Sequence, residues 1–185
     1  MAKNQQLWCP HPEATFVALD FETADRYPDS ACAIGLVRVE KGEVRETLHR
    51  LIRPPRKNME NSWVHGISWA QVAYEPGFEQ VWRDVRGLLD GAEFIAAHNA
   101  GFDKKVLNTC LVAVGEPEEL RPFQCTVKLA RRVWKLPRHN LPSVCDHLQI
   151  ALKHHDAASD AEACARIVIA AARELALMAA ATAQP

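Results

Sequence analysis

The sequence predicts an α/β protein in which helices cover both faces of a five-stranded mixed β-sheet. Three short segments rich in β-forming residues follow one another within the first third of the chain. After them, segments with helical periodicity alternate with short apolar segments. Strands that come first as a group and then alternate with helices are typical of a mixed sheet with helices on its faces. The length of 185 residues fits one domain, which we expect to span residues 1–185 with a core of about 15–175.

The first three predicted strands form an antiparallel meander. They span Thr15–Phe21, Ala31–Val39 and Val44–Ile52, and Lys41-Gly42 supplies the turn between the second and third. Pro54-Pro55 ends the meander because proline cannot donate a hydrogen bond to a sheet ladder.

The rest of the chain alternates between helices and short strands. Ser68 and Gln71 form a capping box, so a short helix follows. The spacing of Val81, Val85, Leu88 and Leu89 predicts one buried helical face. The later elements are expected at Glu93–Ala97 (strand), Phe102–Val114 (helix, ended by Gly115), Phe123–Cys125 (strand), Thr126–Trp134, Pro142–Leu148 and Ser159–Ala179 (helices).

Charge is balanced overall but uneven along the chain. There are 22 Lys plus Arg against 23 Asp plus Glu, so the chain is not strongly basic as a whole. No acid occurs between Glu119 and Asp146, whereas this stretch carries Arg121, Lys128, Arg131, Arg132, Lys135 and Arg138. Such a stretch can follow a nucleic-acid backbone, and Phe123 or Trp134 could stack on bases or belong to the core, the latter favoured for Trp134.

The cysteines and the termini favour a cytoplasmic protein. The six cysteines form no C-x-x-C pair, and residues 1–6 are polar without an apolar signal segment. We therefore expect reduced thiols, most of them buried. The Ala-rich segment Ile167–Ala183 contains Arg173 and Glu174 and is predicted to be a packed helix, not a membrane span.

Asp20 and Glu22 are the first candidate site residues. Alternate residues of a strand point to the same face, so both carboxylates should project together. Such a pair is unfavourable unless a cation lies between the two charges, and oxygen ligands favour Mg²⁺ or Mn²⁺. Two solvated acids at a strand end would be the simpler interpretation of this pair alone.

Three further residues complete the candidate site. Asp103 follows the fourth strand and opens a helix, where it could also be an ordinary helix-start acid. We place His155 in the loop before the last helix and Asp160 in its first turn, because residues five apart on one helix would face different directions. Asp156 or Ser159 could cap that helix. Two divalent ions held by four carboxylates, with a neutral histidine as base, can hydrolyse a phosphodiester.

These residues resemble the three motifs of the DEDDh 3′–5′ exonuclease family, which includes the epsilon subunit of bacterial DNA polymerase III, exonuclease X and ribonuclease T. The resemblance covers about residues 15–175 and includes Asp-Phe-Glu-Thr, Val-His-Gly-Ile at 64–67, His-Asn-x-x-Phe-Asp at 98–103 and Cys-Thr-Val-Lys-Leu-Ala-Arg at 125–131. It implies an RNase H-like fold and a metal-dependent nuclease with two divalent cations, Mg²⁺ or Mn²⁺.

The resemblance also assigns roles to single residues. Asp20, Glu22, Asp103 and Asp160 match the metal ligands, with Asp20 bridging both ions and Glu22 holding the ion nearest the attacking water, and His155 matches the general base. His154 does not match, because it precedes Asp160 by six residues. Thr23 matches a contact near the terminal 3′-OH, and His65 and Phe102 match the pocket of the terminal base, although a turn histidine and a core phenylalanine are equally good interpretations.

The expected substrate is the 3′ end of single-stranded nucleic acid, DNA favoured over RNA, with release of nucleoside 5′-monophosphates during DNA replication or repair. An exoribonuclease, a proofreading subunit bound to a polymerase, a homodimer and an inactive nucleic-acid-binding module are the alternatives. Little chain remains after about residue 180 for a polymerase-binding domain. A dehalogenase-like phosphatase is disfavoured because it needs Asp where this chain has Glu22.

Overall fold

A computed structural model of the chain describes residues 8–182. The polar N-terminal residues 1–6, from which we predicted the absence of a secretion signal, lie outside the described residues. The expected five-stranded mixed sheet is confirmed, with strand order β3-β2-β1-β4-β5.

The first three strands form the predicted antiparallel meander: β1 (Phe16–Thr23), β2 (Ala31–Glu40) and β3 (Glu43–Leu51). Lys41 and Gly42 both have positive φ, as a two-residue hairpin turn between twisted strands requires. β4 (Phe94–Ala97) then pairs parallel with β1, and β5 (Phe123–Cys125) pairs parallel with β4. The paired part of β1 extends two residues beyond its predicted end, so Asp20 and Glu22 both lie within the strand.

The helices follow the predicted order. They are α1 (Ser62–His65), α2 (Trp69–Val72), α3 (Phe78–Val85), the 3₁₀ helix η1 (Arg86–Leu89), α4 (Gly101–Ala113), α5 (Thr126–Val133), α6 (Leu141–Leu148) and α7 (Ala157–Thr182). We did not predict α1, a single turn with no buried residue and therefore no apolar periodicity to signal it. α7 begins two residues earlier than predicted because Asp156 caps it, accepting the Ser159 N–H at 3.2 Å.

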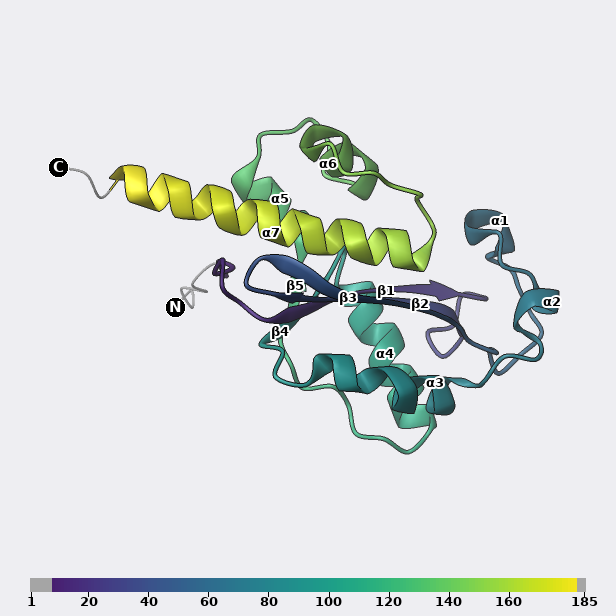
Figure 1. The fold of residues 1–185 in the computed structure, drawn as a ribbon. Helices are drawn as coiled ribbons and strands as arrows, with labels where there is room; N and C mark the ends of the chain where they lie inside the picture. Colours follow the sequence, from purple (N-terminus) through teal and green to yellow (C-terminus); the bar gives the residue numbers. More distant parts are fainter. Residues whose placement is uncertain (1–7, 183–185) are drawn as a thin grey trace, which may run out of the picture.

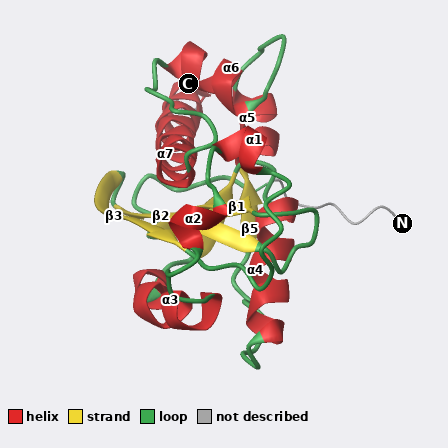
Figure 2. Ribbon diagram, turned by 90° about the vertical axis from the view of Figure 1, so that its right-hand side faces the viewer, coloured by secondary structure: helices red, strands yellow, loops and turns green. Residues whose placement is uncertain are grey.

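The sheet separates two layers of helices. α5, α6 and α7 lie on one side of the sheet, and α3 and α4 lie on the other (Figure 1, Figure 2). Along β1, Phe16 and Ala18 face the first layer, whereas Val17 and Leu19 face the second. The alternation continues past the apolar residues, so Asp20 and Glu22 belong to the face that α7 covers.

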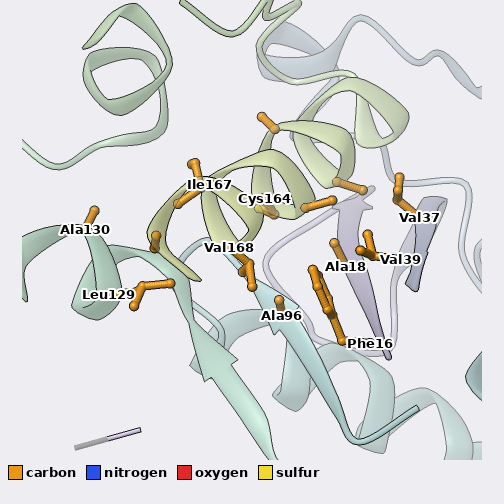
Figure 3. Close-up of a cluster of buried hydrophobic side chains, with 14 of the residues drawn as sticks. Phe16, Ala18, Val37, Val39, Ala96, Leu129, Ala130, Cys164, Ile167 and Val168 are labelled. Carbon is orange, nitrogen blue, oxygen red and sulfur yellow. The ribbon is translucent and has the colours of Figure 1, made fainter. Parts of the chain in front are cut away.

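The core between the sheet and α7 is built from small and medium-sized side chains. Figure 3 shows Cys164, Ile167 and Val168 of α7 packed over Ala18 and its neighbours in the sheet. Small residues let the two backbones approach closely, as at Gly35 on β2. A Cβ atom at Gly35 would lie 2.0 Å from the carbonyl oxygen of Ala157, the first residue of α7. This approach places the beginning of α7 over β2, next to Asp20 of β1, with which Gly35 pairs.

Several smaller expectations are also confirmed. Trp134 is buried in the core and donates through Nε1 to Glu174, whereas Phe123 is partly buried. All six cysteines are free thiols, and four of them are buried. The C-terminal α7 is a packed helix, and none of the helices in residues 8–182 combines the length and the apolar character that crossing a membrane requires.

Candidate active site

Three of the predicted carboxylates meet where α7 begins above β1. Asp20 and Glu22 project from β1 toward α7, and Asp160 lies in the first turn of α7. One carboxylate oxygen from each of the three lies within 4.8 Å of the others. Glu22 and Asp160 are buried, and Asp20 is only partly exposed.

The fourth predicted carboxylate reaches the cluster from the opposite layer. Asp103 is buried in the first turn of α4, and its Oδ1 accepts the backbone N–H of Phe21 at 3.1 Å. Phe21 stands between Asp20 and Glu22, so this hydrogen bond ties the start of α4 to the acidic part of β1. The structure therefore brings the acids of three separate elements, β1, α4 and α7, to one region.

Burial and mutual repulsion make this cluster difficult to ionise without a cation. Burial, followed by the charges of Asp103, Asp160 and Glu22, raises the pKa of Asp20 well above its usual value. Burial also raises the pKa of Glu22 and of Asp103 to about 7 each, and it raises the pKa of Asp160. Carboxylates with raised pKa values in one site are the arrangement that a bound cation relieves.

The orientation of Asp160 fits a cation directly. Its Oδ2 accepts the His154 Nδ1–H at 2.9 Å and the backbone N–H of His155 at 3.2 Å. Its Oδ1 is buried and has no hydrogen-bond partner within residues 8–182. A buried carboxylate oxygen without a partner is costly, so a ligand of opposite charge is expected at this position. The cluster of Asp20, Glu22 and Asp160 offers carboxylate oxygens alone, which suits Mg²⁺ or Mn²⁺.

We predict that the metal-free protein loses stability as the pH rises through about 7. Glu22 has a folded-state pKa of about 7 against an ordinary value near 4.5, so between these values the folded state binds more protons than the unfolded state. The protonated Glu22 therefore contributes on the order of 2 kcal/mol to the free energy of unfolding. This contribution is fully present below pH ~4.5 and is lost as the pH rises through ~7. Urea unfolding in EDTA at pH 5 and pH 8 measures it. Glu22→Gln should unfold like the wild type at pH 5 and be more stable than it at pH 8, and equal curves at both pH values would contradict the prediction.

The histidine loop lies beside this cluster as predicted. His155 precedes α7 with φ of 65°, a left-handed conformation that makes a sharp turn into the helix. Its ring stacks on that of His154, with the centroids 3.8 Å apart. Burial and then the neighbouring His154 lower the pKa of His155, so the ring is neutral at neutral pH. The spacing of the residues did not predict the contact between His154 and Asp160.

Two of the residues predicted to contact the substrate, Thr23 and His65, lie together at the end of β1. Thr23 follows Glu22 and is buried, and Nε2 of His65 lies 3.2 Å from the Thr23 carbonyl oxygen. The Nδ1 of His65 accepts the Ile67 N–H at 3.0 Å, so this ring braces a turn, as the alternative interpretation held. Phe102 is 46% exposed, so its interpretation as a core residue is wrong.

Sequence reasoning missed Asn61 in this region. Its Nδ2 lies within hydrogen-bond distance of the carbonyl oxygen of Thr23 at 3.1 Å and of the Thr23 hydroxyl oxygen at 3.2 Å, and its own N–H donates to Ala24. An asparagine before a serine carries no spacing signal that would have singled it out.

Comparisons with known proteins identify the family. A family model described as an exonuclease, of the RNase T type, matches residues 17–168. The chain belongs to this exonuclease family. The predicted resemblance to exonucleases of this kind, exonuclease X among them, is confirmed by the family model and by the structure of exonuclease X.

Two relatives and two structures illustrate the similarity. DNA polymerase III PolC-type of Thermotoga maritima is 33% identical over 161 residues, which is 85% of this chain and 12% of that protein. Exodeoxyribonuclease 10 of Escherichia coli K12 is 36% identical over 102 residues, 55% of this chain and 40% of that protein. Exonuclease X in complex with a 5′-overhanging duplex DNA is 26% identical with a TM-score of 0.69, covering 85% of this chain and 91% of that one.

The second structure is the nuclease domain of 3′hExo, a DEDDh family member bound to rAMP. It has a TM-score of 0.74 at 17% identity, covering 88% of this chain and 93% of that one, and therefore supports the fold. The chain spans only 12% of the length of the PolC-type relatives.

Proposed function

We propose that the protein is a 3′–5′ exonuclease that hydrolyses single-stranded DNA from its 3′ end and releases nucleoside 5′-monophosphates. The observation that carries this proposal is the cluster of Asp20, Glu22 and Asp160, in which Oδ1 of Asp160 has no hydrogen-bond partner among residues 8–182. Asp103 is tied to the same part of β1 through the Phe21 N–H. Family membership supports the same reaction class. We place the activity in the cytoplasm because the six thiols are free.

The four acids would hold two divalent cations, Mg²⁺ or Mn²⁺. Such ions, when bound, neutralise charge on the attacking and leaving oxygens of the phosphodiester. Asp20 would be the ligand shared by both ions and Glu22 the ligand beside the attacking water, and Asp103 and Asp160 would complete the set. The hydrogen bond from the Phe21 N–H holds one oxygen of Asp103, which fixes the orientation of that carboxylate.

His155 is assigned as the general base. A neutral imidazole accepts a proton from water, and the lowered pKa of His155 keeps its ring neutral at neutral pH. His155 lies in the loop before α7, and its ring lies beside Asp160.

Thr23, His65 and Phe102 are assigned to the terminal nucleotide. Thr23 is adjacent in sequence to Glu22, and Asn61 holds both its carbonyl and its hydroxyl oxygen. The exposed ring of Phe102 is adjacent in sequence to Asp103 and is free to contact a base. Along α5 and the segment after it, exposed Lys128, Lys135 and Arg138 offer positive charge to the DNA backbone.

DNA is proposed over RNA on the strength of the relatives. The relatives named above are a DNA polymerase and an exodeoxyribonuclease, and the exonuclease X structure contains DNA. The similarity to PolC also supports action beside a polymerase during replication or repair. Co-purification of a polymerase with the tagged chain would support that role.

A 5′-labelled oligonucleotide incubated with the protein and Mg²⁺ or Mn²⁺ tests the proposal. We expect a stepwise ladder that shortens from the 3′ end, with nucleoside 5′-monophosphates as products and complete inhibition by EDTA. A matched RNA oligomer should be degraded more slowly.

Two outcomes would contradict this assignment. No cleavage of any DNA or RNA oligomer with either metal would favour the alternative of a binding module without activity. His155→Ala should lower the rate about 10²–10⁴-fold, and an unchanged rate would exclude His155 as the base.

A further inference from the structure

We propose that His154 is a positioning residue that orients both the metal-binding carboxylate of Asp160 and the imidazole of His155. This inference rests on the proposed function, and it concerns a residue whose spacing did not match the family motif. His154 is the residue that contacts both partners through its side chain: a hydrogen bond to Asp160 and a ring stack on His155.

The hydrogen bond determines which oxygen of Asp160 is free. Oδ2 accepts from His154 Nδ1 at 2.9 Å and from the His155 backbone N–H at 3.2 Å, whereas Oδ1 has no partner within residues 8–182. Turning the carboxylate plane away from this orientation would break both hydrogen bonds. The Oδ1 atom is therefore held as the ligand atom, in the way that donors around metal sites fix the orientation of ligands.

The ring stack orients the second partner. The planes of His154 and His155 are inclined by 22° with centroids 3.8 Å apart. Because Nδ1 of His154 is anchored on Asp160, the ring of His154 is a fixed surface for that of His155. The orientation of the proposed base is thereby linked to the orientation of a metal ligand.

The backbone around His154 supports a fixed position. The Lys153 N–H donates to Ser159 Oγ at 2.8 Å, and Lys153 Nζ pairs with Asp156 at 3.0 Å. Asp156 in turn caps α7 through the Ser159 N–H. The loop that carries the two histidines is thus bound to the first turn of the helix that carries Asp160.

Two substitutions separate the hydrogen bond from the stack. His154→Asn can place an amide N–H near the position of Nδ1 but removes the ring, whereas His154→Phe keeps a ring and removes the donor. Mn²⁺ affinity, measured by titration calorimetry without substrate, should fall about 10–100-fold in His154→Phe and in His154→Ala and be largely restored in His154→Asn. At saturating Mn²⁺, the kcat of His154→Asn on the oligonucleotide should remain below that of the wild type, because the ring that orients His155 is missing.

The outcomes distinguish this inference from the proposed function. If the wild type bound no Mn²⁺, the metal centre and the role of His154 would both be wrong. If the wild type bound Mn²⁺ and His154→Ala and His154→Phe bound it equally well, only the role of His154 would be overturned. His154 has a side chain that is 40% exposed, so the variants should fold, and thermal unfolding in EDTA checks this.

Discussion

Asp20→Asn is expected to abolish nuclease activity and at the same time to stabilise the metal-free protein at neutral pH. Asp20 lies at the centre of the acidic cluster, where Asp103, Asp160 and Glu22 all raise its pKa. Removing its charge weakens cation binding by the remaining acids. A loss of about 4 kcal/mol of transition-state stabilisation corresponds to a rate reduction of about 10³-fold.

The gain in stability follows from the same repulsion. Without a cation, burial and three neighbouring acids make the ionised form of Asp20 unfavourable in the folded state. An amide of the same size removes this charge, so the free energy of unfolding in EDTA at pH 8 should rise by about 0.5–2 kcal/mol. In excess Mn²⁺ the wild type should become more stable than Asp20→Asn, because a ligand stabilises the folded state of the protein that binds it more tightly.

A matched control comes from a surface acid. Asp84 on α3 is exposed and contacts only Gln80 among the hydrogen bonds of the described residues, so Asp84→Asn should leave the rate unchanged and the stability within about 0.5 kcal/mol. Oligonucleotide degradation and urea unfolding with and without Mn²⁺ measure both effects. An Asp20→Asn protein that is inactive but also less stable in EDTA would show that Asp20 supports the fold instead of a metal.

The sheet and most of the site could be predicted from the sequence because local patterns determine them. Period-two alternation continues from the apolar part of β1 into Asp20 and Glu22, which places both acids on one face. Asp160 was placed correctly in the first turn of α7, since a loop before a helix is the simplest way to bring His155 beside it. These conclusions need only strand and helix geometry.

The remaining features depend on contacts between distant segments. Asn61 contacts Thr23 across 38 residues, and α1, which follows it, has no buried residue to produce a periodic signal. His154 was set aside on spacing alone, because the hydrogen bond to Asp160 becomes visible only when the loop is folded back on α7. The close approach of Gly35 to Ala157 could not be predicted either, since a glycine in an apolar strand does not indicate which helix packs against it.

Gly35→Ala is the second substitution expected to have a large effect. Gly35 pairs with Asp20 in the sheet, and a Cβ at this position would lie 2.0 Å from the oxygen and 2.3 Å from the carbon of the Ala157 carbonyl. Both are backbone atoms, so the conflict is relieved only if the start of α7 moves away from the sheet. We expect a loss of stability of about 1–3 kcal/mol, the usual cost of overpacking a core.

The effect on activity should exceed what this loss of stability explains. Asp160 lies three residues after Ala157, so a shift of the first turn of α7 moves Asp160 away from Asp20 and Glu22. Displacements of about 1 Å in a catalytic group can cost about 10²-fold in rate. In the folded variant, the Mn²⁺ concentration required for half-maximal rate should rise and kcat should fall.

Gly87→Ala is the matched control, since a Cβ at Gly87 meets no atom within 4 Å and its φ is ordinary. It should be neutral or slightly stabilising. If Gly35→Ala folded with the Mn²⁺ dependence and kcat of the wild type, the close approach of α7 to β2 would not be what positions Asp160. If the predicted loss is found, Gly35 is necessary for the metal centre. Because this position of β2 has no side chain, the start of α7 can lie close to the sheet, and Asp160 can reach Asp20 and Glu22.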